Sequence, residues 1–273
     1  MKIAALQMVS TPDVDRNLDA ARRLIAQAAA IGAELVALPE YFCLMGRADR
    51  DKLAVAEAPG AGPIQRMLAE PPGVHGVWVI GGTLPLRADG LDTGAQPPPE
   101  RVFNASCVYA PDGTLAARYD KIHLFRYDNG SERYDEGRVL QAGEQPVAFE
   151  ARGVRVGLSV CYDLRFPELY RALGTCDLIA VPSAFTYPTG QAHWELLLRA
   201  RAVENQCYVI APAQGGRHEN GRRTWGHSLI ADPWGDVLAV RDEGEGVVTA
   251  EIDPARLAAV RTQLPALTHR RLG

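Results

Sequence analysis

Cys161 stands where a thiol could act as a nucleophile. It follows the apolar run VRVGLSV, which predicts a strand, and it precedes FPEL, where a helix is expected to begin. A residue that leaves the end of a strand places its side chain at the mouth of the sheet, where the active sites of α/β proteins gather. Backbone amides near a helix start favour an anion, so both features favour a thiolate at Cys161.

The other four cysteines are expected to have packing roles. Cys107 lies within a strand pattern, Cys207 begins another, and Cys176 falls in a turn between a helix and a strand. Cys43 follows Glu40 by three residues, and packing is expected there too. The odd number of cysteines, their wide spacing and the lack of a CxxC pair disfavour a disulfide framework and a zinc ribbon, and they predict a reducing, cytoplasmic compartment.

A cysteine nucleophile needs a base and a group that stabilises an oxyanion. Histidine is the usual base, and His123 and His193 are candidates. Glu40 is the alternative, because it stands at a strand end among apolar neighbours that favour a carboxyl able to accept a proton near neutrality. Lys121 follows a hairpin strand and offers positive charge. The residue types alone leave a Cys–His pair and a Cys–Glu–Lys set both open, beside ordinary structural or surface roles.

The bulk properties exclude several classes of protein. The chain has 273 residues, 47% of them hydrophobic and 23% charged, with a formal net charge of −4. Basic residues form no long run, so no nucleic-acid partner is expected. No segment approaches the roughly 18 continuous apolar residues of a membrane span, and the N-terminus reads as a first strand rather than a signal peptide. We therefore expect a cytoplasmic globular protein without a membrane partner.

The elements that must position these residues alternate in an unusual order. Strands are expected at 2–8, 34–40, 77–86, 177–183 and 207–213, and hairpins at 102–121, 147–160 and 227–240. Helices are expected at 13–33, 166–174, 193–205 and 253–264, and a polar loop at 88–100. Helices thus alternate with strand pairs rather than with single strands. Two sheets stacked face to face, with helices outside, would satisfy this pattern.

Three segments, in order, resemble the signatures of a known family. ALPEYF, YDKIHLF and GLSVCYDLRFPEL resemble those of the nitrilase superfamily of carbon–nitrogen hydrolases, and the resemblance spans nearly the whole chain. The family's catalytic glutamate, lysine and cysteine fall on Glu40, Lys121 and Cys161. Its second glutamate falls on Glu136, with Glu132 as the fallback. The resemblance implies an α/β fold, a four-layer α-β-β-α sandwich, in one domain over residues 1–273.

The same resemblance implies a mechanism. Glu40 takes the proton of the Cys161 thiol, and the thiolate attacks an amide carbonyl. Lys121 and the backbone amide of Tyr162 stabilise the oxyanion. The leaving group departs with the proton from Glu40, and water activated by Glu40 hydrolyses the thioester. No metal and no organic cofactor is implied, and the histidines are not spaced as a ligand set.

Later segments resemble the branch of the family that acts on amides of keto acids. In that branch an arginine four residues after the cysteine helps to bind a substrate carboxylate, which falls on Arg165, while Phe185 and Thr189 fall on pocket positions. Bidentate pairing with a carboxylate suits a guanidinium. The structural alternative for Arg165 is an ion pair with Asp163 or Glu168.

Two sub-branches compete for the substrate, one acting on deaminated glutathione and one on the ω-amides α-ketoglutaramate and α-ketosuccinamate. The stretch APAQGGRHENGRRTWGHS resembles the first more closely, and we expect Gln214, Gly216, Arg217 and His218 to contact the far end of a peptidic substrate. The expected partners are a small-molecule anionic amide and further copies of the chain, in a homodimer or larger homo-oligomer.

Other functions remain open on the sequence. They are a catalytically silent scaffold of the same fold, a cysteine peptidase with His193 as its base, and an amidohydrolase for agmatine or carbamoyl substrates. The intact Glu40, Lys121 and Cys161 disfavour the scaffold. A cationic substrate is disfavoured because Arg165 would repel it.

Overall fold

The computed structural model describes residues 1–88, 100–128, 130 and 133–271. Almost all of the polar loop expected at 88–100 therefore lies outside the described residues. Within the described ranges, none of the helices combines the length and the apolar character that crossing a bilayer requires.

Two β-sheets form the centre of the molecule. The first has the strand order β18-β1-β2-β3-β5-β4, with β6 and β9 also paired to β5. Its strands are β1 (Lys2–Gln7), β2 (Leu35–Ala37), β3 (Trp78–Ile80), β4 (Leu84–Arg87), β5 (Val102–Tyr109), β6 (Leu115–Asp120), β9 (Leu140–Gln141) and β18 (Gly246–Glu251). Neighbours β1, β2 and β3 run parallel, so their carboxyl ends meet at one edge.

The second sheet has the order β10-β11-β12-β13-β16-β17. Its strands are β10 (Ala148–Ala151), β11 (Val154–Leu158), β12 (Leu178–Ala180), β13 (Tyr208–Ala211), β16 (Ser228–Ala231) and β17 (Val237–Arg241). Neighbours β11, β12 and β13 are parallel. Two small hairpins lie outside both sheets: β7 (Arg126–Asp128) with β8 (Arg133–Asp135), and β14 (Gly215–Arg217) with β15 (Arg223–Trp225).

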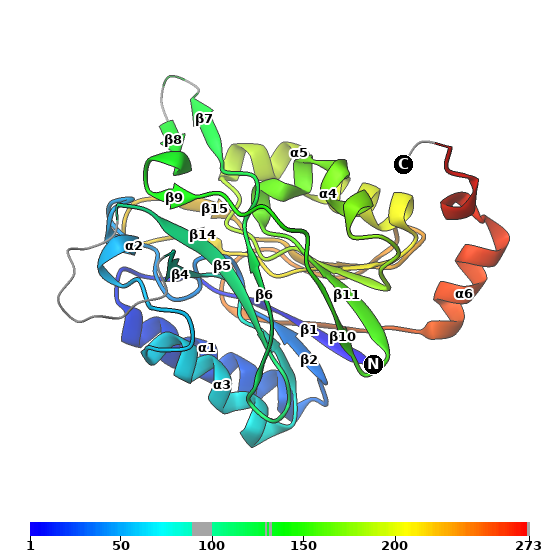
Figure 1. Cartoon of the computed structure of the whole chain (residues 1–273), viewed down its shortest axis with the longest axis horizontal. Coiled ribbons are helices and arrows are strands. Elements are labelled where there is room, and N and C mark those ends of the chain that lie inside the picture. The colour runs from blue at the N-terminus through cyan, green and yellow to red at the C-terminus, as the bar shows by residue number, and fades with distance from the viewer. Residues whose placement is uncertain (89–99, 129, 131–132, 272–273) are drawn as a thin grey trace.

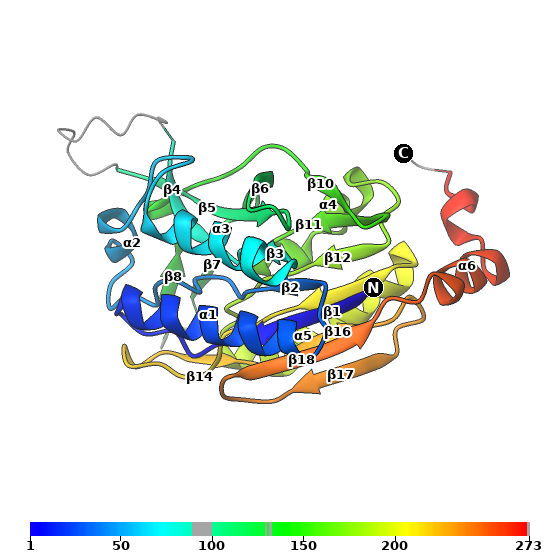
Figure 2. The ribbon, with the colours of Figure 1, turned by 90° about the horizontal axis from the view of Figure 1, so that it is seen from below.

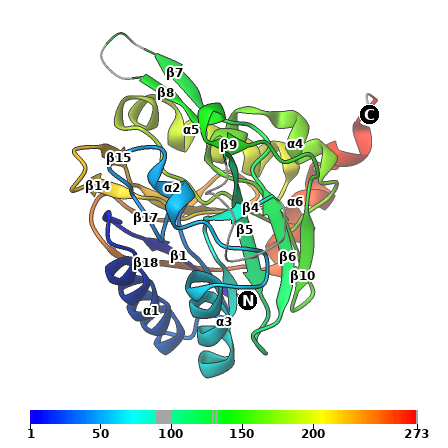
Figure 3. The ribbon, with the colours of Figure 1, turned by 60° about the vertical axis from the view of Figure 1, so that its left-hand side comes forward.

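Helices cover the outer face of each sheet. α1 (Val14–Ala30) and α3 (Pro63–His75) lie against the first sheet, while α4 (Pro167–Ala172) and α5 (Tyr187–Asn205) lie against the second (Figures 1 and 3). The predicted four-layer α-β-β-α sandwich is thereby confirmed. The short α2 (Asp51–Ala54) precedes α3, and α6 (Pro254–Gln263) leads the C-terminal segment away from one end of the sandwich (Figure 2).

Alternating side chains on β1 show how the sequence builds these layers. Ile3 and Ala5 belong to the core shared with the second sheet. Ala4 and Leu6 point the other way, into the core that α1 and α3 cover. Because strand side chains alternate between faces, a strand buried on both sides needs apolar residues on both, as Ile3–Leu6 of β1 provide. The two cores fix the spacing of the layers and hence the positions of the strand ends.

Residues 77–86 differ from the single strand expected there. They form β3 and β4, which are separated at Gly81 and Gly82. Gly82 has φ +53°, and a Cβ atom there would lie 2.1 Å from the carbonyl oxygen of Pro39. The glycine lets the chain break between strands and press against the backbone beside Glu40.

Three further elements depart from expectation. α3 was not predicted, because Pro71 and Pro72 lie inside its last turns and hide the helical pattern. The hairpin of β14 and β15 was also missed, since its strands are only three residues long. α5 begins at Tyr187 rather than at residue 193, with a proline in its first turn.

We predict that Gly82→Ala destabilises the protein strongly. The added methyl group would meet the Pro39 carbonyl in a left-handed conformation, and the two effects together should lower the free energy of unfolding by roughly 3 kcal/mol. Activity should fall as well, because the displaced backbone carries Glu40. Urea unfolding followed by circular dichroism measures the first effect.

Gly153→Ala is the matched control. Gly153 has φ +78°, and a Cβ atom added there would meet nothing within 4 Å among the described residues, so only the left-handed conformation is penalised, at about 1 kcal/mol. Equal losses for the two variants would show that the contact with Pro39 does not matter.

Candidate active site

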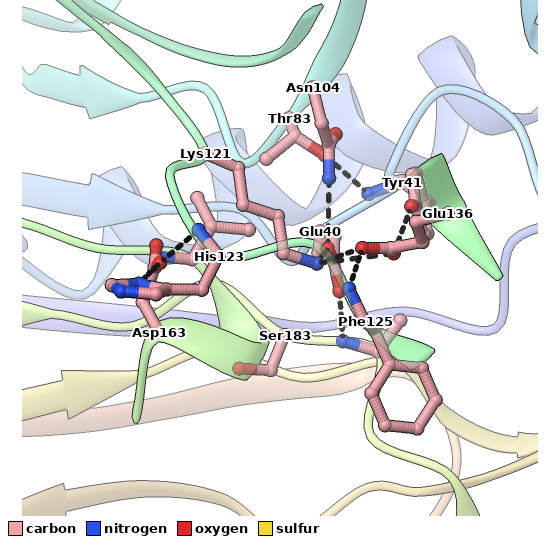
Figure 4. A network of polar contacts seen from close by, with 12 residues as sticks. Glu40, Tyr41, Thr83, Asn104, Lys121, His123, Phe125, Glu136, Asp163 and Ser183 are labelled. Carbon is pink, nitrogen blue, oxygen red and sulfur yellow. Dashed lines mark hydrogen bonds and ion pairs between the residues drawn. The ribbon is translucent and has the colours of Figure 1, made fainter. Parts of the chain in front are cut away.

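The three predicted catalytic residues follow three strand ends that meet at one place. Glu40 follows β2 of the first sheet, Lys121 directly follows β6, and Cys161 follows β11 of the second sheet. Glu40 and Cys161 line one cavity. The Lys121 ammonium donates a hydrogen bond to Glu40 (Figure 4). The stacked sheets therefore bring together residues 121 positions apart in the chain.

Lys121 lies at the centre of a buried ionic cluster. Its side chain is 0% exposed, and its Nζ lies 2.9 Å from Oε1 of Glu40 and 2.8 Å from Oε2 of Glu136. Burial alone would lower the pKa of Lys121, but the carboxylates of Glu136 and Glu40 raise it well above its usual value. The side chain is therefore a fixed ammonium rather than the surface lysine that its residue type suggests.

Glu40 is held by three donors. Its Oε1 accepts from Lys121 and from the Asn104 amide at 2.9 Å, and its Oε2 accepts from the backbone N–H of Ala184 at 2.9 Å. Asn104 lies on β5 of the first sheet, whereas Ala184 follows β12 of the second. Hydrogen bonds from both sheets thus fix the orientation of this carboxylate (Figure 4).

Glu136 completes the cluster. It begins the 3₁₀ helix Glu136–Arg138, and it accepts from the Phe125 N–H and from the Tyr41 hydroxyl, both at 2.7 Å. Burial alone would raise the pKa of Glu136, but Lys121 and these hydrogen bonds outweigh burial and lower it. The fallback residue Glu132 lies outside the described residues. Glu136 thus shares the Lys121 ammonium with Glu40, and its catalytic role stays a prediction.

Cys161 occupies a sharp turn. It opens the 3₁₀ helix Cys161–Arg165 with φ +50°, a left-handed conformation that costs a non-glycine residue about 1 kcal/mol or more. The amides of Cys161 and Asp163 donate to the carbonyls of Pro182 and Val160. For the amide between them, that of Tyr162, no acceptor occurs among the described residues. That N–H is available to the oxyanion that forms on a carbonyl oxygen when the Cys161 sulfur attacks the carbonyl carbon.

The environment of the Cys161 thiol corrects one expectation. Burial raises its pKa well above the usual value, Glu40 adds to the rise, and Lys121 opposes it. The helix that was expected to favour a thiolate, α4, begins only at Pro167 and is six residues long. The raised pKa favours the protonated thiol over the expected thiolate, so ionisation of Cys161 needs a proton acceptor beside it.

The two histidines have other partners. The Nδ1 atom of His123 lies 2.7 Å from Oδ1 of Asp163, and its ring stacks on Phe166 at 3.8 Å. His193 lies on α5, 3.3 Å from an Nη1 of Arg165, and lines a separate hollow on the outside of the sandwich. Neither lines the cavity of Cys161. The geometry favours the Cys–Glu–Lys set over a Cys–His pair.

The expected pocket residues share the cavity with Cys161. Tyr162, Arg165, Phe185 and Thr189 all line it. The Arg165 guanidinium lies 5.6 Å from the centre of the Phe185 ring, and within the described ranges it pairs with neither Asp163 nor Glu168. The complete lining is Glu40, Tyr41, Phe125, Glu136, Cys161, Tyr162, Arg165, Ala184, Phe185, Thr186, Thr189 and Arg222.

The stretch 211–228 lies differently from the expectation. Gln214 is buried and bonds to Ser10 and to the Glu40 carbonyl, and His218 bonds to Ser10 and Thr224. Arg217 is exposed. Gln214 therefore contacts the backbone of Glu40 from outside the cavity, and none of Gln214, Gly216, Arg217 and His218 lines it. From this stretch the lining includes Arg222 alone.

The family model for carbon–nitrogen hydrolases matches residues 2–262. The chain belongs to the carbon–nitrogen hydrolase family. It is an enzyme of that family, and the expected nitrilase-superfamily membership is confirmed. The matched region ends before the C-terminus, so the extension of one domain over residues 1–273 stays a prediction.

Individual relatives are similar to this chain over nearly its whole length. This hydrolase is 42% identical over 272 residues to a deaminated glutathione amidase of Synechocystis sp., covering 98% of this chain and 97% of the relative. It is 36% identical over 274 residues to the omega-amidase NIT2 of Xenopus tropicalis, covering 99% and 95%. The crystal structure of Saccharomyces cerevisiae Nit3, a member of branch 10 of the nitrilase superfamily, matches with TM-score 0.85 and 30% identity, covering 100% and 97%.

Sequence reasoning missed residues that position the site of this hydrolase. Asp163 is fully buried and accepts from Tyr119, the Val160 amide and His123, so it holds the turn of Cys161 against the first sheet. Asn104 orients Glu40. The positions of Asp163 within CYDLR and of Asn104 within a strand pattern did not indicate Tyr119, His123 or Glu40 as partners, because these residues lie far away in sequence.

We predict that Glu136→Gln destabilises the hydrolase in a pH-dependent manner. The lowered pKa of Glu136 means that its ionised form stabilises the fold above its ordinary value of 4.5, and that this contribution is lost as the pH falls through the folded value. The variant should lose about 1–3 kcal/mol of unfolding free energy at neutral pH. The difference from wild type should be constant above about pH 5.5 and shrink below 4.5. Urea titrations from pH 4 to 8 measure it.

Glu144→Gln serves as the control, because Glu144 is exposed. It should change the unfolding free energy little at any pH. A Glu136→Gln variant as stable as wild type at neutral pH would contradict the assigned ionic cluster.

Proposed function

We propose that this hydrolase cleaves the amide bond of a carboxylate-bearing substrate, deaminated glutathione, through a thioester on Cys161. The observation that carries the proposal is that one cavity joins the Cys161 thiol, the Glu40 carboxylate held by Lys121, and the guanidinium of Arg165. A nucleophile, a proton acceptor, an oxyanion donor and a carboxylate binder are thus provided together. The 42% identity to a deaminated glutathione amidase supports the choice of substrate.

Acylation begins from the protonated thiol. Glu40 accepts the proton of Cys161, and the sulfur attacks the carbonyl carbon of the amide. The negative charge that develops on the carbonyl oxygen is stabilised by Lys121 Nζ and by the free N–H of Tyr162. Collapse of the intermediate breaks the C–N bond, and the proton held by Glu40 passes to the departing amine. The acyl group remains on the sulfur.

In deacylation, water is the nucleophile and the Cys161 sulfur is the leaving group. Glu40 takes a proton from water, whose oxygen attacks the thioester carbon at the position that the amine has left. The sulfur departs and recovers a proton from Glu40, and the acid is released. Glu136 keeps Lys121 charged and in place through both steps, because the ammonium lies between the two carboxylates.

Arg165 is proposed to bind a carboxylate of the substrate. It shares its 3₁₀ helix with Cys161 and lines the same cavity, with aromatic rings of Phe185 and Tyr162 beside it. Phe185 and Thr189 then limit the shape of the pocket. A fixed cation that has lost part of its water favours an anionic substrate and disfavours cationic ones such as agmatine.

An omega-amidase is the second candidate. A single arginine near the nucleophile suffices for the one carboxylate of α-ketoglutaramate, and the omega-amidase of Xenopus tropicalis is 36% identical. Rates on deaminated glutathione, α-ketoglutaramate, glutamine, a simple nitrile and N-carbamoyl amino acids decide between the candidates. The proposal predicts the highest kcat/KM for deaminated glutathione, and faster hydrolysis of α-ketoglutaramate would move the assignment to the omega-amidases.

We predict that Cys161→Ala abolishes turnover and leaves the fold intact. Glu40→Gln removes the proton acceptor at constant size, and Lys121→Met removes the charge but keeps the stem. Each should lower kcat by about 100-fold or more with a much smaller change in KM, because both act in the transition state. Steady-state kinetics with circular dichroism of each variant measure these effects.

Cys43→Ala is the control for the nucleophile. Cys43 is a buried thiol on the loop after Glu40, and burial raises its pKa too. This variant should lose some stability but keep its chemistry. Near-normal turnover by Cys161→Ala, or an increase in KM alone for Glu40→Gln or Lys121→Met, would show the assigned roles to be wrong.

We also infer a cytoplasmic homodimer or larger homo-oligomer. All five cysteines are free thiols, which agrees with a reducing compartment. The outer helix α5 exposes Leu196 and Val203 beside Trp234, and such apolar groups suit an interface between copies. Light scattering at micromolar concentration should give at least twice the 29.6 kDa of one chain. A monomer mass would exclude the oligomer.

A further inference from the structure

The cavity holds a second guanidinium that the proposed mechanism does not use. Arg222 lies on the turn between β14 and β15, and it lines the cavity together with Arg165. The turn is fixed by hydrogen bonds: the Arg222 N–H donates to Asn220, and the Arg222 carbonyl accepts from the amide of His218. The Asn220 amide in turn donates to the Gly46 carbonyl. Arg222 is thus presented to the cavity from a rigid support.

The contacts of Arg222 leave its charge uncompensated within the described residues. Its guanidinium lies 4.8 Å from the centre of the Tyr134 ring, and its Nη1 lies 4.0 Å from the Met45 sulfur. Neither contact is an ion pair. The two carboxylates of the cavity, Glu40 and Glu136, both bind Lys121 instead.

The neighbouring Arg223 shows the contrast. It pairs with Glu243 at 2.7 Å and lies 3.6 Å from the centre of the Tyr187 ring, outside the cavity. Of these two consecutive arginines, one has an acidic partner and the other faces the place where a substrate must bind. A cation so placed favours an anionic group on the ligand.

We propose that Arg222 binds a second substrate carboxylate, on the amine side of the scissile amide. Arg165 shares the 3₁₀ helix of Cys161, so it stays beside the acyl group while that group is bound to the sulfur. Arg222 belongs to a separate hairpin, and in this proposal it binds the carboxylate of the amine that leaves. The substrate class is therefore an amide flanked by a carboxylate on each side.

This inference rests on the proposed function and narrows it. Deaminated glutathione carries a keto-acid carboxylate on its acyl part and the glycine carboxylate on its amine part. α-Ketoglutaramate carries only the first, because its amine part is ammonia. Arg222 is therefore the residue that should raise kcat/KM for deaminated glutathione above that for α-ketoglutaramate.

The test compares deaminated glutathione with its C-terminal amide, in which the glycine carboxylate alone is neutralised. Wild-type enzyme should lose about 10- to 100-fold in kcat/KM on the amide, the range expected for one charged hydrogen-bonded contact. Arg222→Met should lose a similar factor on deaminated glutathione and less than about threefold on its amide. Arg222→Lys should recover part of the loss, and Arg165→Met should lower both rates.

Arg217→Met is the matched control, because Arg217 lies in the same stretch but is exposed and outside the cavity. It should leave both rates unchanged. Equal losses of Arg222→Met on the two substrates, or equal wild-type rates on them, would overturn the role of Arg222 while the proposed function stands. If the wild type hydrolyses α-ketoglutaramate and neither peptide substrate, the proposed function fails, and the second carboxylate site fails with it.

Discussion

The buried ammonium of Lys121 is the constraint on which the site depends. Removing an ammonium from water costs several kcal/mol, and that cost is offset only by close, well-directed partners. Lys121 has two such partners, Glu40 and Glu136, at 2.9 and 2.8 Å. The ammonium in turn stabilises the two carboxylates that flank it. Neither glutamate can be moved without affecting the other.

The fold provides these partners by bringing the ends of strands from both sheets together at the site. Glu40 comes from the first sheet, yet the Ala184 amide that holds its second oxygen follows a strand of the second sheet. Cys161 comes from the second sheet, yet Asp163 beside it is bonded to Tyr119 of the first. The interface between the sheets is therefore both the larger apolar core and the support of the polar site. A shift of one sheet against the other would separate the thiol from its proton acceptor.

Residue types and spacing predicted two stacked sheets with helices outside, because alternation and turn residues are local properties. The choice of Glu40 and Lys121 as partners of Cys161 came from the family resemblance instead. The burial of Lys121 could not be predicted from its residue type, because lysines usually lie on the surface. The thiolate expected at Cys161 was wrong, since its pKa depends on the surrounding charges and on burial. Arg222 was overlooked in favour of Gln214 and its neighbours, because a motif does not show which of its side chains face a cavity. Each of these outcomes is set by contacts between residues distant in sequence.

The central claim is that Cys161 carries the acyl group of the substrate during turnover. The most direct measurement is acid quenching of the enzyme within milliseconds of mixing with deaminated glutathione, followed by mass spectrometry of the intact chain and of its proteolytic peptides. We expect an added mass equal to the keto-acid acyl group, located on the peptide with Cys161 and absent from Cys161→Ala. Turnover with an adduct on another residue, or continued turnover by Cys161→Ala, would contradict it.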